Sequence, residues 1–149
     1  MIEDNPAIQN VIAALNELYN NDAELLENEV HEGALNGRLA NYLREIFEMD
    51  SISVDQEYNR HRDQLKNYGI DRKNAVVDIV IHERMTDDNN LIAFECKRKE
   101  VGGRDIEKLE ALIGPEFNYQ YGILVLYYPK VITIYRIEDA KVKTKELSI

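Results

Sequence analysis

The sequence predicts an α/β protein whose helices cover the faces of a β-sheet. Apolar residues recur at helical spacing before residue 50, and apolar runs of strand length follow them. One further helical segment separates two groups of strands, so the expected order is helix, helix, strand, strand, strand, helix, strand, strand. At 149 residues the chain can bury a core as one domain. We take 1–149 as a single domain in which 1–28 forms an N-terminal helical extension.

Two long helices are expected within the first fifty residues. Asn5 and Pro6 are typical of a helix cap and a first helical position. The apolar residues that follow share one helical face: Ile8, Val11, Ile12, Leu15 and Leu18. A short helical piece follows around 22–26, and the second long helix spans roughly 29–49. Its apolar stripe consists of Leu35, Leu39, Leu43, Ile46 and Phe47. Glu32 lies one turn before this stripe on the same face, so we expect it to point inward.

The first strand is expected at 51–58, and a long basic loop over 59–73 separates it from a hairpin. The hairpin pairs the apolar runs 76–81 and 91–97. The turn between them is rich in Asp and Asn, which adopt tight turns readily.

A helix and a second group of strands follow the hairpin. Asp105 is expected to cap the helix, which ends after Ile113 because Gly114 and Pro115 are stop signals. A further pair of strands is expected at 121–128 and 131–137. In the last segment, 141–145, lysines alternate with uncharged residues, and lysines on an edge strand discourage unwanted pairing.

Charged residues interrupt both apolar strands of the hairpin. Asp78 lies on the first strand, and Glu95 and Lys97 share one face of the second. Buried charge is costly and normally persists only with a partner or a metal. A turn centred near 86–88 places position 78 opposite 95 to 97, where facing Cβ atoms are about 5 Å apart. We therefore expect two carboxylates and an ammonium in one small volume. A structural salt bridge on a partly exposed face is the alternative.

Two carboxylates so close favour a bound cation, because one of them must otherwise hold a proton. Their oxygen atoms suit Mg²⁺ or Mn²⁺, with water and substrate phosphate completing the coordination shell. Such a metal makes hydroxide available near neutral pH, and a neighbouring lysine stabilises charge that develops on a phosphoryl group. The arrangement favours metal-assisted hydrolysis of phosphodiester bonds.

Asp78 followed by Glu95-Cys96-Lys97 resembles the D…(D/E)-x-K signature of the PD-(D/E)XK nuclease superfamily. Members often carry a further acid on the helix before the sheet, and Glu32 resembles that residue. The likeness runs from about residue 29 to residue 137, with Val77 in place of the proline of the signature. It implies the restriction-endonuclease-like fold, a mixed β-sheet flanked by helices, and cleavage of nucleic acid with Mg²⁺.

This hypothesis assigns a role to each candidate residue. Asp78, Glu95 and the Cys96 carbonyl bind the metal, and Lys97 positions the attacking water. Glu32 holds a second metal or its water, although an acid at a helix start also serves as a cap. The Cys96 side chain faces away from the acids, so we expect it to be a buried apolar group.

The charge distribution bears on the partner. A formal net charge of −10 argues against a simple nucleic-acid binder. Residues 1–50, with eleven acids and two bases, carry −9 of it, so the part with the candidate site is almost neutral. Several basic residues are candidate contacts to a phosphate backbone, although each also suits a solvated surface: Arg60, Arg62, Lys73 and Lys99. We expect DNA in preference to RNA.

The alternative function is a catalytically inactive nuclease-like fold that binds partners within a larger complex. The acidic N-terminal region motivates it, as a surface for a second copy or another protein. The N-terminus lacks the pattern of a signal peptide, and no apolar stretch is long enough to span a bilayer. The single cysteine fits a reducing compartment. These features predict a cytoplasmic protein that does not bind membranes.

Overall fold

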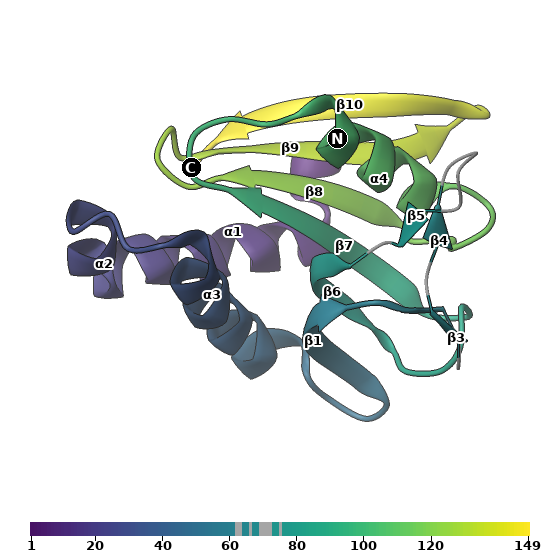
Figure 1. Cartoon of the computed structure of the whole chain (residues 1–149), viewed down its shortest axis with the longest axis horizontal. Coiled ribbons are helices and arrows are strands. Elements are labelled where there is room, and N and C mark those ends of the chain that lie inside the picture. The colour runs from purple at the N-terminus through teal and green to yellow at the C-terminus, as the bar shows by residue number, and fades with distance from the viewer. Residues whose placement is uncertain (62–63, 66, 69–72, 75) are drawn as a thin grey trace.

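The computed structural model describes residues 1–61, 64–65, 67–68, 73–74 and 76–149. A six-stranded mixed sheet runs through the protein in the order β1-β6-β7-β8-β9-β10 (Figure 1). Its strands are β1 (Ile52–Tyr58), β6 (Val77–Glu83), β7 (Asn90–Lys97), β8 (Tyr121–Leu126), β9 (Val131–Glu138) and β10 (Lys141–Ser148). Neighbouring strands are antiparallel, except that β7 and β8 are parallel. The predicted α/β class is confirmed, and β10 lies at an edge as its lysines predicted.

The helices also agree with the periodicity of the sequence. They are η1 (Ile2–Asp4), α1 (Pro6–Asn21), α2 (Ala23–Glu27), α3 (Glu32–Phe47) and α4 (Gly103–Ile113). Asn5 caps α1 as predicted, because its Oδ1 accepts hydrogen bonds from the amides of Ala7 at 2.9 Å and Ile8 at 3.3 Å. The second long helix begins at Glu32, a few residues later than expected, and this places the Glu32 side chain in the first turn of α3.

The helices cover the two faces of the sheet (Figure 1). On one face, α1 and α3 enclose the larger apolar core, which includes Ile79, Phe94 and Cys96. On the other face, α4 packs on a smaller core that includes Val80, Ala93 and Leu124. Alternation along the strands therefore sends neighbouring residues to different helices. Glu95 and Lys97 share the α4 side with Ala93, whereas Cys96 enters the α1 and α3 side.

The connection from β7 to β8 positions α4 against the sheet. Parallel neighbours need a crossover, and α4 provides it. Gly122 on β8 allows the close approach, because a Cβ added there would lie 3.3 Å from Leu109 Cδ2 of α4. Asp105 caps this helix from within its first turn, and its Oδ2 accepts from the Gly102 amide at 2.9 Å.

The prediction of one loop over 59–73 is wrong in part. Four two-residue strands lie in this region: β2 (Arg60–His61), β3 (Gln64–Leu65), β4 (Asn67–Tyr68) and β5 (Lys73–Asn74). They form two small ladders, β2 with β3 and β4 with β5, outside the main sheet. Strands of two residues are too short to show the apolar alternation that predicts a strand from sequence.

Among the described residues, no helix combines the length and the apolar character needed to cross a membrane.

Candidate functional site

The hairpin of β6 and β7 brings two carboxylates to adjacent strands. Its register pairs Ile79 with Phe94 and Val80 with Ala93. Continuing this register by one residue places Asp78 opposite Glu95, as the sequence predicted. The turn chemistry and the alternation of the strands therefore located the pair correctly, because both are local properties of the chain.

The backbone pairing of β6 opens at Asp78. The ladder with β7 ends at Ile79. Beyond it, the Cys96 amide of β7 donates to the Asp78 side chain, with its nitrogen 2.8 Å from Oδ2. On the other neighbour, Glu57 of β1 adopts φ 49° and leaves the ladder at the position that faces Asp78. The N–H and C=O of one residue in an extended strand point to the same side. The Cys96 carbonyl therefore lies on the edge of β7 that faces Asp78.

Glu95 is almost completely buried, with 4% of its side chain exposed. Its Oε1 lies 2.8 Å from Nζ of Lys108, a residue of α4. Its Oε2 is buried and has no hydrogen-bond partner among the residues that the structure describes. Burial, followed by the charge of Asp78, raises the pKa of Glu95 to about 7, although Lys108 opposes this shift. A carboxylate held in this way is poorly satisfied by the protein alone.

Asp78 is partly buried, and unlike Glu95 it accepts a hydrogen bond from a backbone amide. Burial raises its pKa above the usual range, and the hydrogen bond from the Cys96 amide and the charges of Lys108 and Lys97 oppose the increase. The two carboxyl groups thus both resist ionisation, as expected for neighbouring acids that share a partly buried volume.

Lys97 lies on the predicted face but contacts another acid. Its Nζ is 3.5 Å from Asp105 Oδ1 on α4, and about a third of its side chain is exposed. Burial alone would lower the pKa of Lys97, but the charges of Asp105, Glu32 and Glu95 outweigh burial and raise it. Lys97 therefore stays protonated beside the carboxylates.

Glu32 approaches the site from the start of α3. Burial raises its pKa, the charge of Lys97 lowers it, and Asp78 raises it further. Its carboxylate is half-buried in a shallow groove formed by the start of α3 and the segment after β7, and the groove residues are Glu29, Glu32, Lys97, Arg98, Lys99 and Glu100. Glu32 therefore lies beside Lys97 and does not point into the apolar core as its place on the stripe predicted.

The structure also tests how many metal ligands come together. Within 1–61, 64–65, 67–68, 73–74 and 76–149, no group of three or more His, Cys, Asp or Glu side chains is arranged to hold a metal ion. Glu32 is thus not brought into one coordination sphere with Asp78 and Glu95. The Cys96 thiol is fully buried on the opposite face, as predicted.

Lys108 and Asp105 are site residues that sequence reasoning missed. The sequence predicts only a capping role for Asp105 and no role for Lys108. A signal for both was present, because they flank the apolar stripe of α4 formed by Ile106, Leu109 and Leu112. Polar residues at the border of such a stripe face the edge of the buried surface, and here that border meets the hairpin.

Four basic residues were predicted to contact a phosphate backbone. Arg62 lies outside the described residues, as do the side chains of Arg60 and Lys73. Lys99 is exposed at the groove beside Glu32; its Nζ is 3.3 Å from Glu29 Oε1 and 5.3 Å from the centre of the Tyr128 ring. Lys99 is placed where a ligand in the groove would meet it.

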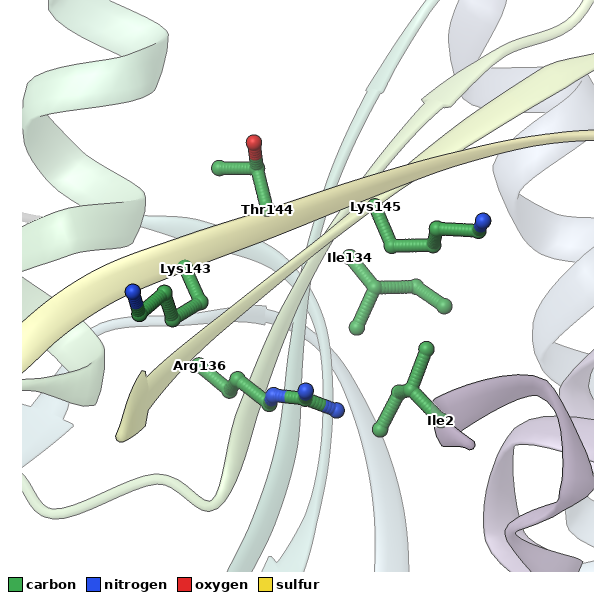
Figure 2. Close-up of a pocket in the computed structure, with 6 residues that line it drawn as sticks. All are labelled: Ile2, Ile134, Arg136, Lys143, Thr144 and Lys145. Carbon is green, nitrogen blue, oxygen red and sulfur yellow. The ribbon is translucent and has the colours of Figure 1, made fainter. Parts of the chain in front are cut away.

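A second hollow, at the edge formed by β9 and β10, is separate from the carboxylates. Figure 2 shows Lys145 and Ile134 on the same side of the strands as Ile2, while Thr144 points to the opposite side. Its six lining residues include three basic side chains and no carboxylate. This hollow lacks oxygen ligands for a hard cation, so we do not assign the metal chemistry to it.

No protein-family model matches the chain, and neither a curated protein nor a solved structure matches it. Function is therefore inferred from the geometry of the carboxylates.

The donor set fits a hard divalent cation. Mg²⁺ is commonly held by only one or two carboxylates, with water and substrate phosphate at its other positions. Asp78, Glu95 and the Cys96 carbonyl all offer oxygen atoms. The free, buried Oε2 of Glu95 is a ligand atom without another partner in the described part of the chain.

Proposed function

We propose that the protein is a metal-dependent nuclease that hydrolyses phosphodiester bonds, with DNA as the expected substrate. The observation that carries this proposal is the pair Asp78 and Glu95. The two carboxylates face each other where the β6–β7 ladder opens, and Glu95 keeps one buried oxygen without a described partner. Structural ion pairs normally satisfy both oxygens of a buried carboxylate.

Each residue has a chemical role in this proposal. Asp78, Glu95 and the Cys96 carbonyl would hold Mg²⁺ or Mn²⁺, which when bound supplies a water of lowered pKa and polarises the phosphoryl oxygen. Lys97, protonated and partly exposed, can position water and stabilise negative charge on the phosphoryl group. Glu32 and Lys97 line the groove next to the pair, so Glu32 can orient water or a second cation from outside the first coordination sphere.

The architecture supports the same proposal. A mixed sheet flanked by helices, with the acid pair on a central hairpin and a helix with Glu32 before it, is compatible with the restriction-endonuclease-like fold implied by the sequence resemblance. We infer membership of the PD-(D/E)XK superfamily from this combination. Function depends on the site and not on the fold alone, so the test addresses the site.

The test is a cleavage assay on plasmid, linear duplex DNA, single-stranded DNA and RNA with Mg²⁺, Mn²⁺ or EDTA. Asp78→Asn and Glu95→Gln remove one metal-binding charge each and should lower cleavage by more than about 100-fold, because each removes a direct ligand. Glu107→Gln is the matched control: it removes the same charge from an exposed position on α4 and should cleave like the wild type.

Two results would contradict the proposal. One is the absence of metal-dependent cleavage of every substrate by the folded wild-type chain. The other is cleavage by Asp78→Asn and Glu95→Gln at the rate of Glu107→Gln. Circular dichroism of each variant confirms that any loss is not a loss of folding.

A second candidate function is a nuclease-like fold that only binds partners. The ion pair of Lys108 with Glu95 favours it, because an ammonium 2.8 Å from Oε1 already neutralises one carboxylate. Thermal unfolding separates the two candidates. A ligand that binds only the folded state raises the melting temperature. A nuclease should therefore show a rise with millimolar Mn²⁺ that Asp78→Asn lacks, whereas a metal-free binding module should show none.

A further inference from the structure

Lys108 brings a positive charge from α4 to both strands of the hairpin. Its Nζ lies 2.8 Å from Glu95 Oε1 on β7 and donates to the Val76 carbonyl, just before β6, at 2.9 Å. Its side chain is 15% exposed, and that of Glu95 is 4% exposed. The ammonium is therefore held in a nearly enclosed position by acceptors on both sides of the opening between the strands.

The same ammonium acts on both carboxylates. Its charge lowers the pKa of Glu95 and of Asp78, against the burial that raises them. Lys97 is directed elsewhere, to Asp105, at the longer distance of 3.5 Å. Lys108 is thus the residue that supplies the counter-charge at the centre of the pair.

We propose that Lys108 occupies the cation position of this site and sets its affinity for divalent metal ions. The inference rests on the proposed function, since it concerns the same two carboxylates. A divalent ion between Asp78 and Glu95 would adjoin the ammonium, and like charges a few ångströms apart in a partly buried volume repel strongly. Binding of the ion therefore requires Lys108 to withdraw from Oε1.

The geometry makes such an exchange feasible without unfolding. Glu95 Oε2 has no hydrogen-bond partner in the described ranges and is available before Oε1 is released. The lysine side chain is flexible, and its other acceptor is a backbone carbonyl at an exposed residue, Val76. Lys108 therefore acts as a resident cation: it stabilises the metal-free chain and weakens metal binding at the same time.

The experiment compares Mn²⁺ binding to metal-free wild-type protein and three variants by isothermal titration calorimetry. Lys108→Met removes the charge and retains most of the side-chain volume, so it should bind Mn²⁺ at least about tenfold more tightly. Lys108→Arg keeps the charge and should remain close to the wild type. Lys141→Met, an exposed position on β10, controls for the change in net charge and should also remain close to the wild type. The Mn²⁺-induced rise in melting temperature should be largest for Lys108→Met.

Each outcome decides a separate point. If the wild type binds Mn²⁺ and Lys108→Met binds it equally or less tightly, the role of Lys108 is overturned while the proposed nuclease function stands. If neither binds, the proposed function fails together with the inference. If Lys108→Met does not fold without metal, Lys108→Gln replaces it, because Gln lacks the charge but can still donate to Glu95, and the same tightening is expected.

Discussion

Charged groups gather at both ends of β6, and the two clusters differ in how the protein satisfies them. Toward the C-terminal end of β6, Asp55 of β1 contacts Arg84 and His82. Its Oδ1 accepts from Arg84 Nη2 at 2.6 Å, and its Oδ2 lies 2.9 Å from Arg84 Nε and 2.8 Å from His82 Nε2. These contacts, led by the hydrogen bonds from Arg84, hold the pKa of Asp55 below its usual range.

At the N-terminal end of β6, Asp78 and Glu95 lie in the opposite situation. Burial raises the pKa of both carboxyl groups, and Glu95 Oε2 has no partner within the described residues. The first cluster is a complete ion-pair network that contributes to stability. In the cluster of Asp78 and Glu95, a buried carboxylate oxygen lacks a partner among the described residues, which lowers stability and is typical of a functional site. The difference in pKa shift and in hydrogen bonding therefore distinguishes the structural cluster around Asp55 from the candidate active site at Asp78 and Glu95.

The largest expected contrast is in the pH dependence of unfolding. The pKa of Glu95 is raised from 4.5 to about 7, so between these values the folded chain binds more protons than the unfolded chain. The free energy of unfolding should therefore fall as pH rises through this window. Relative to Glu95→Gln, the wild type should lose about 3 kcal/mol over it in EDTA. Urea unfolding of both chains across the window measures this, and a pH-independent difference would contradict the burial of a poorly satisfied carboxylate.

Asp55 should change the pH dependence of stability in the opposite direction from Glu95, and the change in the free energy of unfolding should be somewhat smaller. The pKa of Asp55 is lowered, so its contribution to stability is present above about 3.8 and is lost as pH falls below that value. At neutral pH the Asp55→Asn variant should lose about 2 kcal/mol, because Arg84 and the buried His82 lose an ionised acceptor. Metal-dependent cleavage per folded molecule should not change. Loss of cleavage in a folded Asp55→Asn protein would place this cluster within the functional site.

The smallest effect is expected for Arg84→Lys. The change removes a two-pronged contact to Asp55 and retains the charge. Because 57% of the Arg84 side chain is exposed, solvent screens the interaction, and the loss should be about 0.5 kcal/mol. Thermal unfolding near neutral pH measures it. A loss several times larger would show that the Asp55 network depends on geometry more than on charge.

Much of the hairpin could be predicted from the sequence. Apolar runs with period-two alternation and an Asp- and Asn-rich turn determine which residues pair and which face each occupies. These features predict Asp78 opposite residues 95 to 97 and Cys96 on the buried side. The short strands β2 to β5 could not be predicted, because a strand of two residues is too short to show a periodic pattern.

The salt-bridge partners of the charged side chains were harder to predict than the strands and helices on which these side chains lie. Lys97 lies on the face of Glu95 as expected, but its salt bridge to Asp105 of α4 was not predicted. Glu32 was expected to point inward with the apolar stripe, yet its half-buried side chain lies in the groove beside Lys97. Long side chains reach several ångströms from the backbone, so small differences in the position of a packed helix decide which pair forms.

By itself, the sequence determined the order of the long helices and of the strands of the main sheet, the approximate register of the hairpin and the two carboxylates that the hairpin carries. These properties depend on side-chain periodicity and turn chemistry, which act over a few residues. Only the tertiary structure decided that Lys108 meets Glu95. That contact arises because α4, as the crossover between the parallel strands β7 and β8, packs back over the hairpin, and the contact of a helix with a distant strand depends on packing that no local pattern encodes.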